Sequence, residues 1–482
     1  MHKKLMGYAL VYAVLSSVLT SVYPVLDEES YLYIAQSMSV DRPYDWMLPW
    51  PPYTDSYRYA HPPLFLYWVW LGAGLFGSSI AWLKFFLGFP FRLLLGYTAS
   101  WILLQHTSSS NQKWSILAWV SSPIVLMVGA RSMMPDLMFS AFGMCAVMLY
   151  LSAQEEQKIQ RFLCGMFLGF ACWVKYPALL LWVPIVFSYR TWRGMWPIVA
   201  GFLCTWGFGE VWLWSVYGQS HLGVVLSTAD HVGRGPLLGR ATGFFMRLLL
   251  GMPFLLLLYH RRNLWLVLLV LPITWWCIPD LSMMGSAIAM VWIAISVIGV
   301  ASCIRRMDFF TVWWITIFVG VCSTHNFASP RYLILGMVPL VVLIMRECSE
   351  GGWLRYPILV FSFGMSVQIA YSEHSHAKET LKIVQSIDIE GRYSGEWTFR
   401  WAMREKGMKL WKGESASVLL PKQAVGGVFP QGFSRTHVYL GREGRRVLLD
   451  QAHSVGYYSE LLGFWPVGYH QGTIEEVYVW TP

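Results

Sequence analysis

The sequence predicts an all-α polytopic membrane bundle of about thirteen spanning helices, followed by a small C-terminal exported α/β domain. Of the 482 residues, 56% are hydrophobic and only 13% are charged, whereas a soluble domain carries roughly 25% charged residues. Apolar runs of about 15–22 residues follow one another through most of the chain, and this length crosses a hydrocarbon core about 30 Å thick. The polar character after residue 371 predicts the separate domain. The composition excludes a soluble globular enzyme.

The predicted spans are thirteen apolar runs. They lie at 6–25, 82–104, 114–131, 137–152, 162–174, 176–188, 195–215, 243–259, 264–280, 282–303, 309–325, 332–346 and 355–371. The first run follows two lysines but has no small-x-small cleavage site, so it predicts a retained helix rather than a removed signal peptide. The run 63–76 opens on paired prolines and is short for a crossing, so we expect it along the membrane interface within a first exported loop, 26–81.

Membrane topology explains the net charge of +9 better than nucleic-acid binding does, because the basic residues are dispersed among short loops. If 63–76 is not a crossing, the basic residues of these short loops all fall on one face, which the positive-inside rule identifies as the cytoplasmic face. They are Lys3, Lys4, Lys113, Lys158, Arg161, Arg190, Arg193, Arg261, Arg262, Arg305, Arg306, Arg346 and Arg355. The N-terminus is then cytoplasmic, and everything after residue 371 is exported.

The exported part, 372–482, contains charges, glycines and short alternating stretches such as Thr436–Leu440 and Glu476–Trp480. Alternation of this kind predicts strands, and about 110 residues suffice for a core of their own; a loose appendage to the bundle is the alternative. All eight cysteines lie in or next to the apolar runs, so we expect neither a disulfide framework nor a cysteine zinc site.

Polar residues collect at the exported ends of the spans. The first group is Asp27-Glu28-Glu29, followed by Tyr31 and Tyr33. A carboxylate held at the membrane surface suits a general base on an acceptor hydroxyl, or a cation ligand. The alternative is a solvated helix start, where acids are favourable in the first turn.

Two further groups follow. His61 precedes the paired prolines, which stiffen the chain and present the imidazole at the entrance to an apolar run; a structural histidine is the alternative. Arg131 and Asp136 lie close together in a tight turn between two spans, where a structural ion pair is the alternative to a role in a site.

Two cations complete the pattern. Lys175 separates the runs 162–174 and 176–188, and Arg331 lies in Ser329-Pro330-Arg331-Tyr332 at the exported mouth of a span. Each is either a snorkelling side chain or an anion ligand. Acids and cations gathered on one face beside lipid suit group transfer from a lipid phosphate, because the cations would neutralise the leaving group as its bond breaks.

These residues, taken in order, resemble a known family. The matching set is Asp27-Glu28, Tyr31-Leu32-Tyr33-Ile34-Ala35, His61-Pro62-Pro63-Leu64, Arg131, Pro135-Asp136, Lys175 and Ser329-Pro330-Arg331-Tyr332-Leu333. It looks like the C-type (GT-C fold) membrane glycosyltransferases, and among them the bacterial family-39 proteins related to protein O-mannosyltransferases and to the aminoarabinose transferase that modifies lipid A. The resemblance covers roughly residues 6–371, which makes 1–371 the expected transferase domain.

The resemblance implies an inverting transferase that moves a sugar from a polyprenyl phosphate to an envelope acceptor on the exported face, in a bacterial inner membrane. It implies catalytic roles for Asp27 and Glu28, donor phosphate binding by Lys175 and Arg331, and a cavity shaped by His61, Arg131, Asp136 and Tyr31. His61 stands where the aminoarabinose transferase has a lysine. Some relatives need a divalent metal. No second Asp-x-Asp is present here, so we expect neither a metal nor a cofactor. We also expect no nucleic-acid partner.

Two other functions remain compatible with the residues. A transporter or flippase of lipid-linked sugars would also need charges in an apolar bundle, although repeated halves and binding groups near the midplane would be expected of it. A non-enzymatic assembly or sensor protein, with the exported domain as its working part, is the other.

Overall fold

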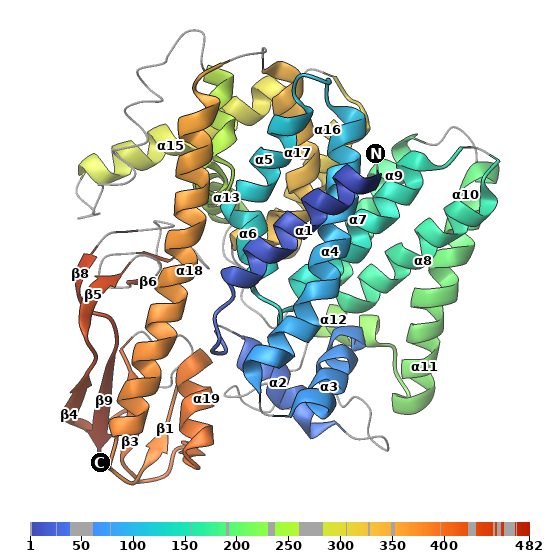
Figure 1. Cartoon of the computed structure of the whole chain (residues 1–482). Coiled ribbons are helices and arrows are strands. Elements are labelled where there is room, and N and C mark those ends of the chain that lie inside the picture. The colour runs from blue at the N-terminus through green and yellow to red at the C-terminus, as the bar shows by residue number, and fades with distance from the viewer. Residues whose placement is uncertain are drawn as a thin grey trace.

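A computed structural model of the chain describes residues 2–25, 27–38, 61–77, 79–154, 156–188, 192–229, 237–259, 283–304, 306–325, 328–348, 352–395, 397–422, 430–446, 449–450, 455–456, 468 and 470–482. Most of these residues are helical and form a bundle, and a small mixed sheet lies at one end of it (Figure 1). The predicted run 264–280 falls outside the described residues.

Apart from three helices at 28–37, 64–76 and 221–229, the bundle helices follow the predicted apolar runs in order. They are α1 (His2–Val18), α2 (Glu28–Ser37), α3 (Leu64–Phe76), α4 (Ile80–His106), α5 (Gln112–Ser121), α6 (Pro123–Ala130), α7 (Pro135–Ser152), α8 (Lys158–Val174), η1 (Tyr176–Leu181), α9 (Trp182–Ser188), α10 (Trp192–Phe202), the π-helical η2 (Leu203–Gly207), α11 (Phe208–Tyr217), α12 (His221–Ala229), α13 (Leu237–Gly251), η3 (Pro253–Tyr259), α15 (Met283–Cys303), α16 (Phe309–Thr324), η4 (Pro330–Leu333), α17 (Ile334–Glu347) and α18 (Arg355–Ser386).

Several predicted spans are broken helices. Within the described ranges, α4 and α7 are long and apolar enough to cross a membrane alone, and α5 with α6 makes a third span if the two are counted together across their 55° bend. Pro123 opens α6 and causes that bend, because proline has no N–H to continue the hydrogen bonding of α5. The predicted helix 6–25 ends early, at Val18. The carbonyls of Ser21 and Tyr23 accept hydrogen bonds from Lys84 instead of continuing the helix.

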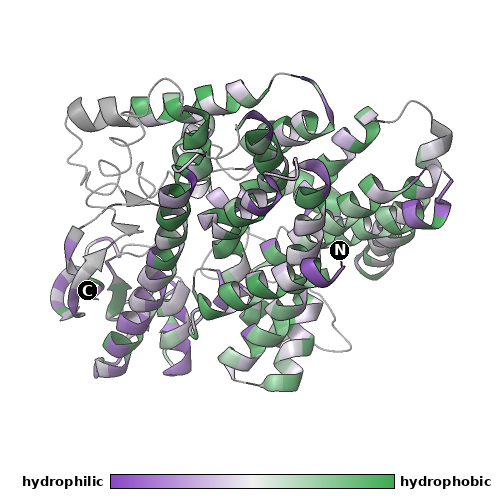
Figure 2. Ribbon diagram, turned by 45° about the horizontal axis from the view of Figure 1, so that its top comes forward, coloured by the Kyte–Doolittle hydropathy of each residue, from purple (hydrophilic) through white to green (hydrophobic). Residues whose placement is uncertain are grey.

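The bundle and the C-terminal part of the chain differ in hydropathy. Apolar residues predominate along the bundle helices, and hydrophilic residues gather in the C-terminal part (Figure 2). Helix α18 passes from one region into the other: its first half is apolar, and the half after Tyr371 carries the run Ser372-Glu373-His374. The predicted domain boundary at residue 371 therefore lies inside a continuous helix.

The C-terminal domain contains the end of α18, α19 (Trp397–Glu405) and a five-stranded sheet in the order β2-β1-β3-β9-β4. The sheet strands are β1 (Arg392–Tyr393), β2 (Lys409–Leu410), β3 (Val418–Pro421), β4 (Ser434–Leu440) and β9 (Glu476–Thr481). The two strands that alternation predicts are β4 and β9, and they pair antiparallel, with Val438 opposite Tyr478. Two small antiparallel pairs lie beside the sheet, β5 (Glu443–Arg446) with β8 (His470–Thr473) and β6 (Leu449–Asp450) with β7 (Val455–Gly456).

This domain has a core of its own. Ile383 of α18, Phe399 and Met403 of α19, and Leu419 and Val477 of the sheet pack together out of contact with water. The domain lies at the same end of the molecule as α2 and α3, with α19 between α18 and α2 (Figure 1). The fold thus brings α2, which is close to the start of the sequence, against α19 of the C-terminal domain.

Candidate functional site

Three consecutive acids begin α2, and each faces a cation from a different part of the chain. Asp27 is the N-cap residue, but its side chain makes no capping hydrogen bond. Its carboxylate lies 3.6 Å from Arg331. The next two acids, Glu28 and Glu29, are buried. A solvated helix start, the alternative for this cluster, does not describe these two residues.

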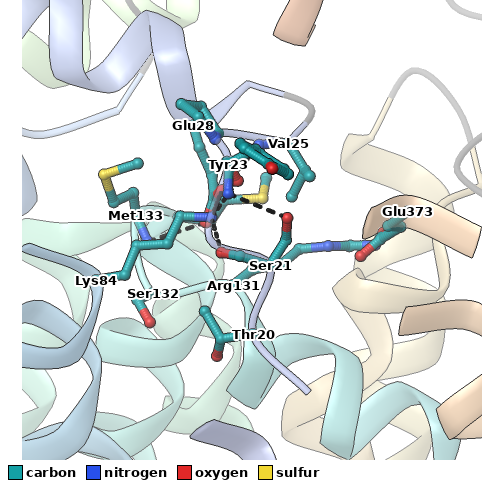
Figure 3. A network of polar contacts seen from close by, with 12 residues as sticks. Thr20, Ser21, Tyr23, Val25, Glu28, Lys84, Arg131, Ser132, Met133 and Glu373 are labelled. Atoms are coloured by element: carbon teal, nitrogen blue, oxygen red, sulfur yellow. Dashed lines mark hydrogen bonds and ion pairs between the residues drawn. The ribbon is translucent and has the colours of Figure 1, made fainter. Parts of the chain in front are cut away.

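Glu28 is bound inside the bundle. Its carboxylate forms an ion pair of 2.5 Å with Lys84 of α4, and it accepts hydrogen bonds from the backbone N–H groups of Val25 and Met133. Lys84 in turn donates to the carbonyls of Ser21 and Tyr23 (Figure 3). The pair therefore ties the segment before α2 to α4 and to the turn between α6 and α7.

Glu29 is bound to the C-terminal domain. Its carboxylate pairs with the guanidinium of Arg400 in α19, and both side chains are buried. Arg400 also donates to the hydroxyl of Ser30, and Arg404 lies 3.8 Å from the second carboxylate oxygen of Glu29. On the other side of Asp27, the hydroxyl of Thr398 donates to the carbonyl of Pro24 at 2.7 Å.

Asp27 is the most accessible acid of the three. Its side chain is 29% exposed, whereas that of Glu28 is fully buried. Arg331, at the start of the short helix η4, also donates toward the sulfur of Met134 at 3.6 Å and to the Tyr332 hydroxyl at 3.4 Å. At 3.6 Å the contact of Asp27 with Arg331 is longer than a strong charge-assisted hydrogen bond, which is about 2.7–2.9 Å.

Lys175 forms a buried ion pair of 2.7 Å with Asp136. Asp136 lies in the first turn of α7, and Lys175 takes the extended conformation that separates α8 from η1. The ammonium also lies 4.7 Å from the centre of the Tyr332 ring, next to Arg331. Snorkelling, the alternative for Lys175, does not describe a side chain that is 4% exposed.

Arg131 and Asp136 take different partners. Arg131 pairs with Glu373 of α18, and both side chains are buried (Figure 3). This pair joins the turn between α6 and α7 to the helix that leads into the C-terminal domain. The ion pair considered for Arg131 and Asp136 is thus replaced by a pair of Asp136 with Lys175 and a pair of Arg131 with Glu373.

His61 and Tyr31 complete the neighbourhood. His61 lies close enough to Lys175, Asp136, Arg331 and His325 for their charges to interact. Burial lowers the pKa of His61 well below its ordinary value of 6.5, and the positive charge of Lys175 acts in the same direction. Tyr31 packs edge-on against Phe65 at 5.5 Å.

The fold brings most of the predicted site residues together. Lys175 is within electrostatic reach of Asp27, Asp136 and Arg331, and His61 is within electrostatic reach of Lys175, Asp136 and Arg331. Glu28 and Arg131 belong to the adjoining network of Figure 3. Sequence reasoning named Glu29 and Tyr332 only as neighbours of site residues, and it gave no role to four further residues that bind or border these side chains, namely Lys84, His325, Glu373 and Arg400.

The arrangement supplies two cations, an accessible carboxylate and a neutral imidazole at one end of the bundle. Two buried polar atoms, the second carboxylate oxygen of Asp136 and Nε of Arg331, have no hydrogen-bond partner among the described residues. Such atoms are costly to bury unpaired, so they favour a polar ligand at this place. The described ranges contain no group of three or more His, Cys, Asp or Glu side chains placed to hold a metal ion.

Comparison with family models gives no match, and no curated protein matches the sequence. Among solved structures, the chain is similar to ArnT from Cupriavidus metallidurans bound to undecaprenyl phosphate, with a TM-score of 0.49, 12% identity, and coverage of 86% of this chain and 92% of that one.

It is also similar to the oligosaccharyltransferase of Archaeoglobus fulgidus in its apo form, with a TM-score of 0.45, 10% identity, and coverage of 85% of this chain and 60% of that one. Both proteins are glycosyltransferases of the C-type fold, the class that the sequence resembles. Because the TM-scores lie below 0.5, the case for a function depends on the side chains described above.

Proposed function

We propose that the protein is an inverting glycosyltransferase that moves a sugar from a polyprenyl phosphate donor to an acceptor of the cell envelope, a lipid, glycan or protein. One observation carries the proposal: an accessible carboxylate, Asp27, lies beside Arg331, and Arg331 and Lys175 approach the same ring of Tyr332. A base and an anion-binding pair in one place are the groups that transfer from a phosphate requires.

The chemistry follows from these roles. Asp27 accepts the proton of the acceptor hydroxyl, whose oxygen attacks the anomeric carbon of the sugar from the face opposite the phosphate. The bond between that carbon and the phosphate oxygen breaks, and the polyprenyl phosphate leaves with the electron pair. Lys175 and Arg331 would bind that phosphate and stabilise the charge that develops on it. Attack opposite the leaving group inverts the anomeric centre.

Of the two predicted catalytic acids, Asp27 suits the role of base better. The carboxylate of Glu28 already binds Lys84 and two backbone N–H groups, and it has no exposed surface. A group bound in this way is poorly placed to exchange a proton with an entering acceptor. Glu28 is therefore assigned to holding the segment that carries Asp27, and His61, Asp136 and Tyr31 to the wall of the cavity.

We also propose that the bundle spans a bacterial inner membrane with thirteen crossings, a cytoplasmic N-terminus and an exported C-terminal domain. Large apolar side chains on its surface support a lipid environment, among them Trp196, Phe208 and Trp214, which are 66%, 67% and 61% exposed. Exposed apolar side chains in such number favour lipid over water as the surroundings of these helices. The polar site would then lie at the exported end, beside the C-terminal domain.

The test is transfer of radiolabelled sugar from a panel of polyprenyl phosphate sugars to total envelope material by the purified protein. Wild type should transfer one of the sugars, and Asp27→Asn should lose at least 100-fold of that rate, because general base catalysis contributes about 10²–10⁴-fold. Asp388→Asn is the matched control, since Asp388 is an exposed aspartate of the C-terminal domain that binds Tyr439.

Donor binding should survive the Asp27→Asn change, because a base acts mainly in the transition state. Equal loss of binding and turnover would remove the base assignment. If wild type binds a donor but transfers sugar from none of the panel, the proposal fails and a transporter or flippase of lipid-linked sugars replaces it.

A further inference from the structure

We infer that α19 of the C-terminal domain positions Asp27, so that Arg400 is a positioning residue of the site although it lies outside the bundle. This inference rests on the proposed function for its kinetic consequence. The structural observation is that α19 binds the chain on both sides of Asp27: Thr398 holds the carbonyl of Pro24, and Arg400 holds Glu29 and Ser30.

Asp27 accepts hydrogen bonds at its carbonyl from the N–H groups of Ser30 and Tyr31, so its backbone follows the first turn of α2. Its side chain makes no capping bond to α2, and its contact with Arg331 is 3.6 Å long. The neighbouring residues provide the constraint instead. Glu28 is held by Lys84 from the bundle, and Glu29 is held by Arg400 from the C-terminal domain. The position of the Asp27 carboxylate therefore depends on two buried ion pairs with different origins.

The contacts of α19 extend further along α2. The guanidinium of Arg404 lies 3.9 Å from the centre of the Tyr33 ring and 3.8 Å from a carboxylate oxygen of Glu29. Trp397, the first residue of α19, packs against the core of the bundle and has a φ of 61°. Tryptophan rarely adopts this left-handed conformation, so contacts made by α19 must offset its cost.

A second set of contacts holds the domain that carries α19. Glu373 of α18 pairs with Arg131, and the ring of His374 stacks on that of Tyr23 at a centroid distance of 5.3 Å. Arg131 belongs to the turn that leads into α7, where Asp136 binds Lys175. The C-terminal domain thus contacts both the segment of the proposed base and the turn next to the proposed phosphate site.

The consequence is a specific effect on turnover. Loss of the Arg400 contact should let the segment 24–30 shift, and a displacement of about 1 Å of a reacting group lowers the rate by about 100-fold. Donor binding by Lys175 and Arg331 should change little. Arg400→Met should therefore lower kcat by 10-fold to 100-fold, with the KM for the donor within about threefold of wild type.

The experiment compares four variants of the full chain in detergent. Arg400→Met removes the contact and Arg400→Lys keeps its charge, so the lysine variant should recover part of kcat. The double variant Glu29→Gln/Arg400→Met removes both charges. It replaces Arg400→Met in the test if an unpaired Glu29 prevents that single variant from folding. Lys422→Met is the matched control, because Lys422 pairs with Glu476 elsewhere in the same domain at 2.5 Å; it should leave kcat unchanged.

Hydrogen–deuterium exchange of the segment 22–38 supplies a readout that needs no activity. Exchange should rise in Arg400→Met and stay at the wild-type level in Lys422→Met. Unchanged kcat in Arg400→Met, or equal losses in both variants, would overturn the inference. If wild type transfers no sugar, the proposed function fails separately, and exchange alone decides whether α19 holds the segment; equal exchange in the two variants would then reject it.

Discussion

The carboxylate of Asp27 lies 3.6 Å from the guanidinium of Arg331, while the next two acids are bound at closer range to cations that come from elsewhere. Asp27 is thus the one acid of the three whose partner also borders the proposed phosphate site. A ligand phosphate would compete with this carboxylate for Arg331. The contact is compatible with a pair that separates when the donor binds.

Removal of either proposed phosphate ligand should weaken donor binding. Arg331→Gln and Lys175→Gln are each expected to lower the affinity for undecaprenyl phosphate by about tenfold or more, because a hydrogen bond to a charged group contributes about 1.5–3 kcal/mol. Titration of the purified protein by calorimetry measures the effect. Arg346→Gln is the matched control, since Arg346 pairs with Asp308 away from the site. Unchanged affinity in both test variants would exclude the phosphate assignment.

Replacement of Lys175 alone should destabilise the protein more than replacement of both Lys175 and Asp136. Lys175→Met leaves a buried carboxylate without its partner, which costs about 3–5 kcal/mol. The double variant with Asp136→Leu removes both charges and should melt at a higher temperature than Lys175→Met alone. Melting followed by tryptophan fluorescence gives the order of the two, and the reverse order would show that the pair is not a buried unit.

His61 should make stability depend on pH. Burial lowers its pKa well below 6.5 in the folded protein, so below about pH 6.5 the unfolded chain binds a proton that the folded chain does not. The contribution of His61 to stability is complete above that pH and is lost as the pH falls. Wild type should therefore lose more melting temperature between pH 7.5 and pH 5 than His61→Gln does; equal losses would contradict the assignment.

Addition of one methyl group at Gly201 should disrupt the close packing of α10 against α8. A Cβ on Gly201 would lie 2.0 Å from the carbonyl oxygen of Phe162, and a Cβ on Gly165 would lie 2.0 Å from that of Ile198. Gly201→Ala should lower stability by about 1–3 kcal/mol, as overpacking does. Gly364→Ala carries the same substitution where nothing lies within 4 Å, and should be neutral or slightly stabilising. Melting temperatures that fall together would refute this packing.

Local pattern predicts the elements and much of the neighbourhood of the site. Alternation predicts β4 and β9 correctly, and long apolar runs predict α4 and α7. The bend between α5 and α6 carries a sequence signal, Pro123 within the predicted span 114–131, which a count of hydropathy alone does not use. Hydropathy specifies that a segment is buried, but it does not specify where the helix breaks.

Two buried cations carried a signal that the sequence analysis did not use. Lys84 and Arg92 both lie inside the predicted span 82–104, where charges are costly and so indicate polar partners. Lys84 binds Glu28, and Arg92 donates to the hydroxyls of Ser17 and Ser132. The partners themselves could not be predicted, because nothing local in the sequence relates residue 84 to residue 28, or Arg400 to Glu29.

The pairing of Glu29 with Arg400 also constrains how the protein matures. The arginine lies 371 positions after the acid, so the segment that carries Asp27 gains this contact only after the whole bundle has been synthesised. During that interval the bundle can insert, but the proposed base is not yet held. A product that stops before Trp397 would lack this contact, and we expect it to turn over no faster than Arg400→Met.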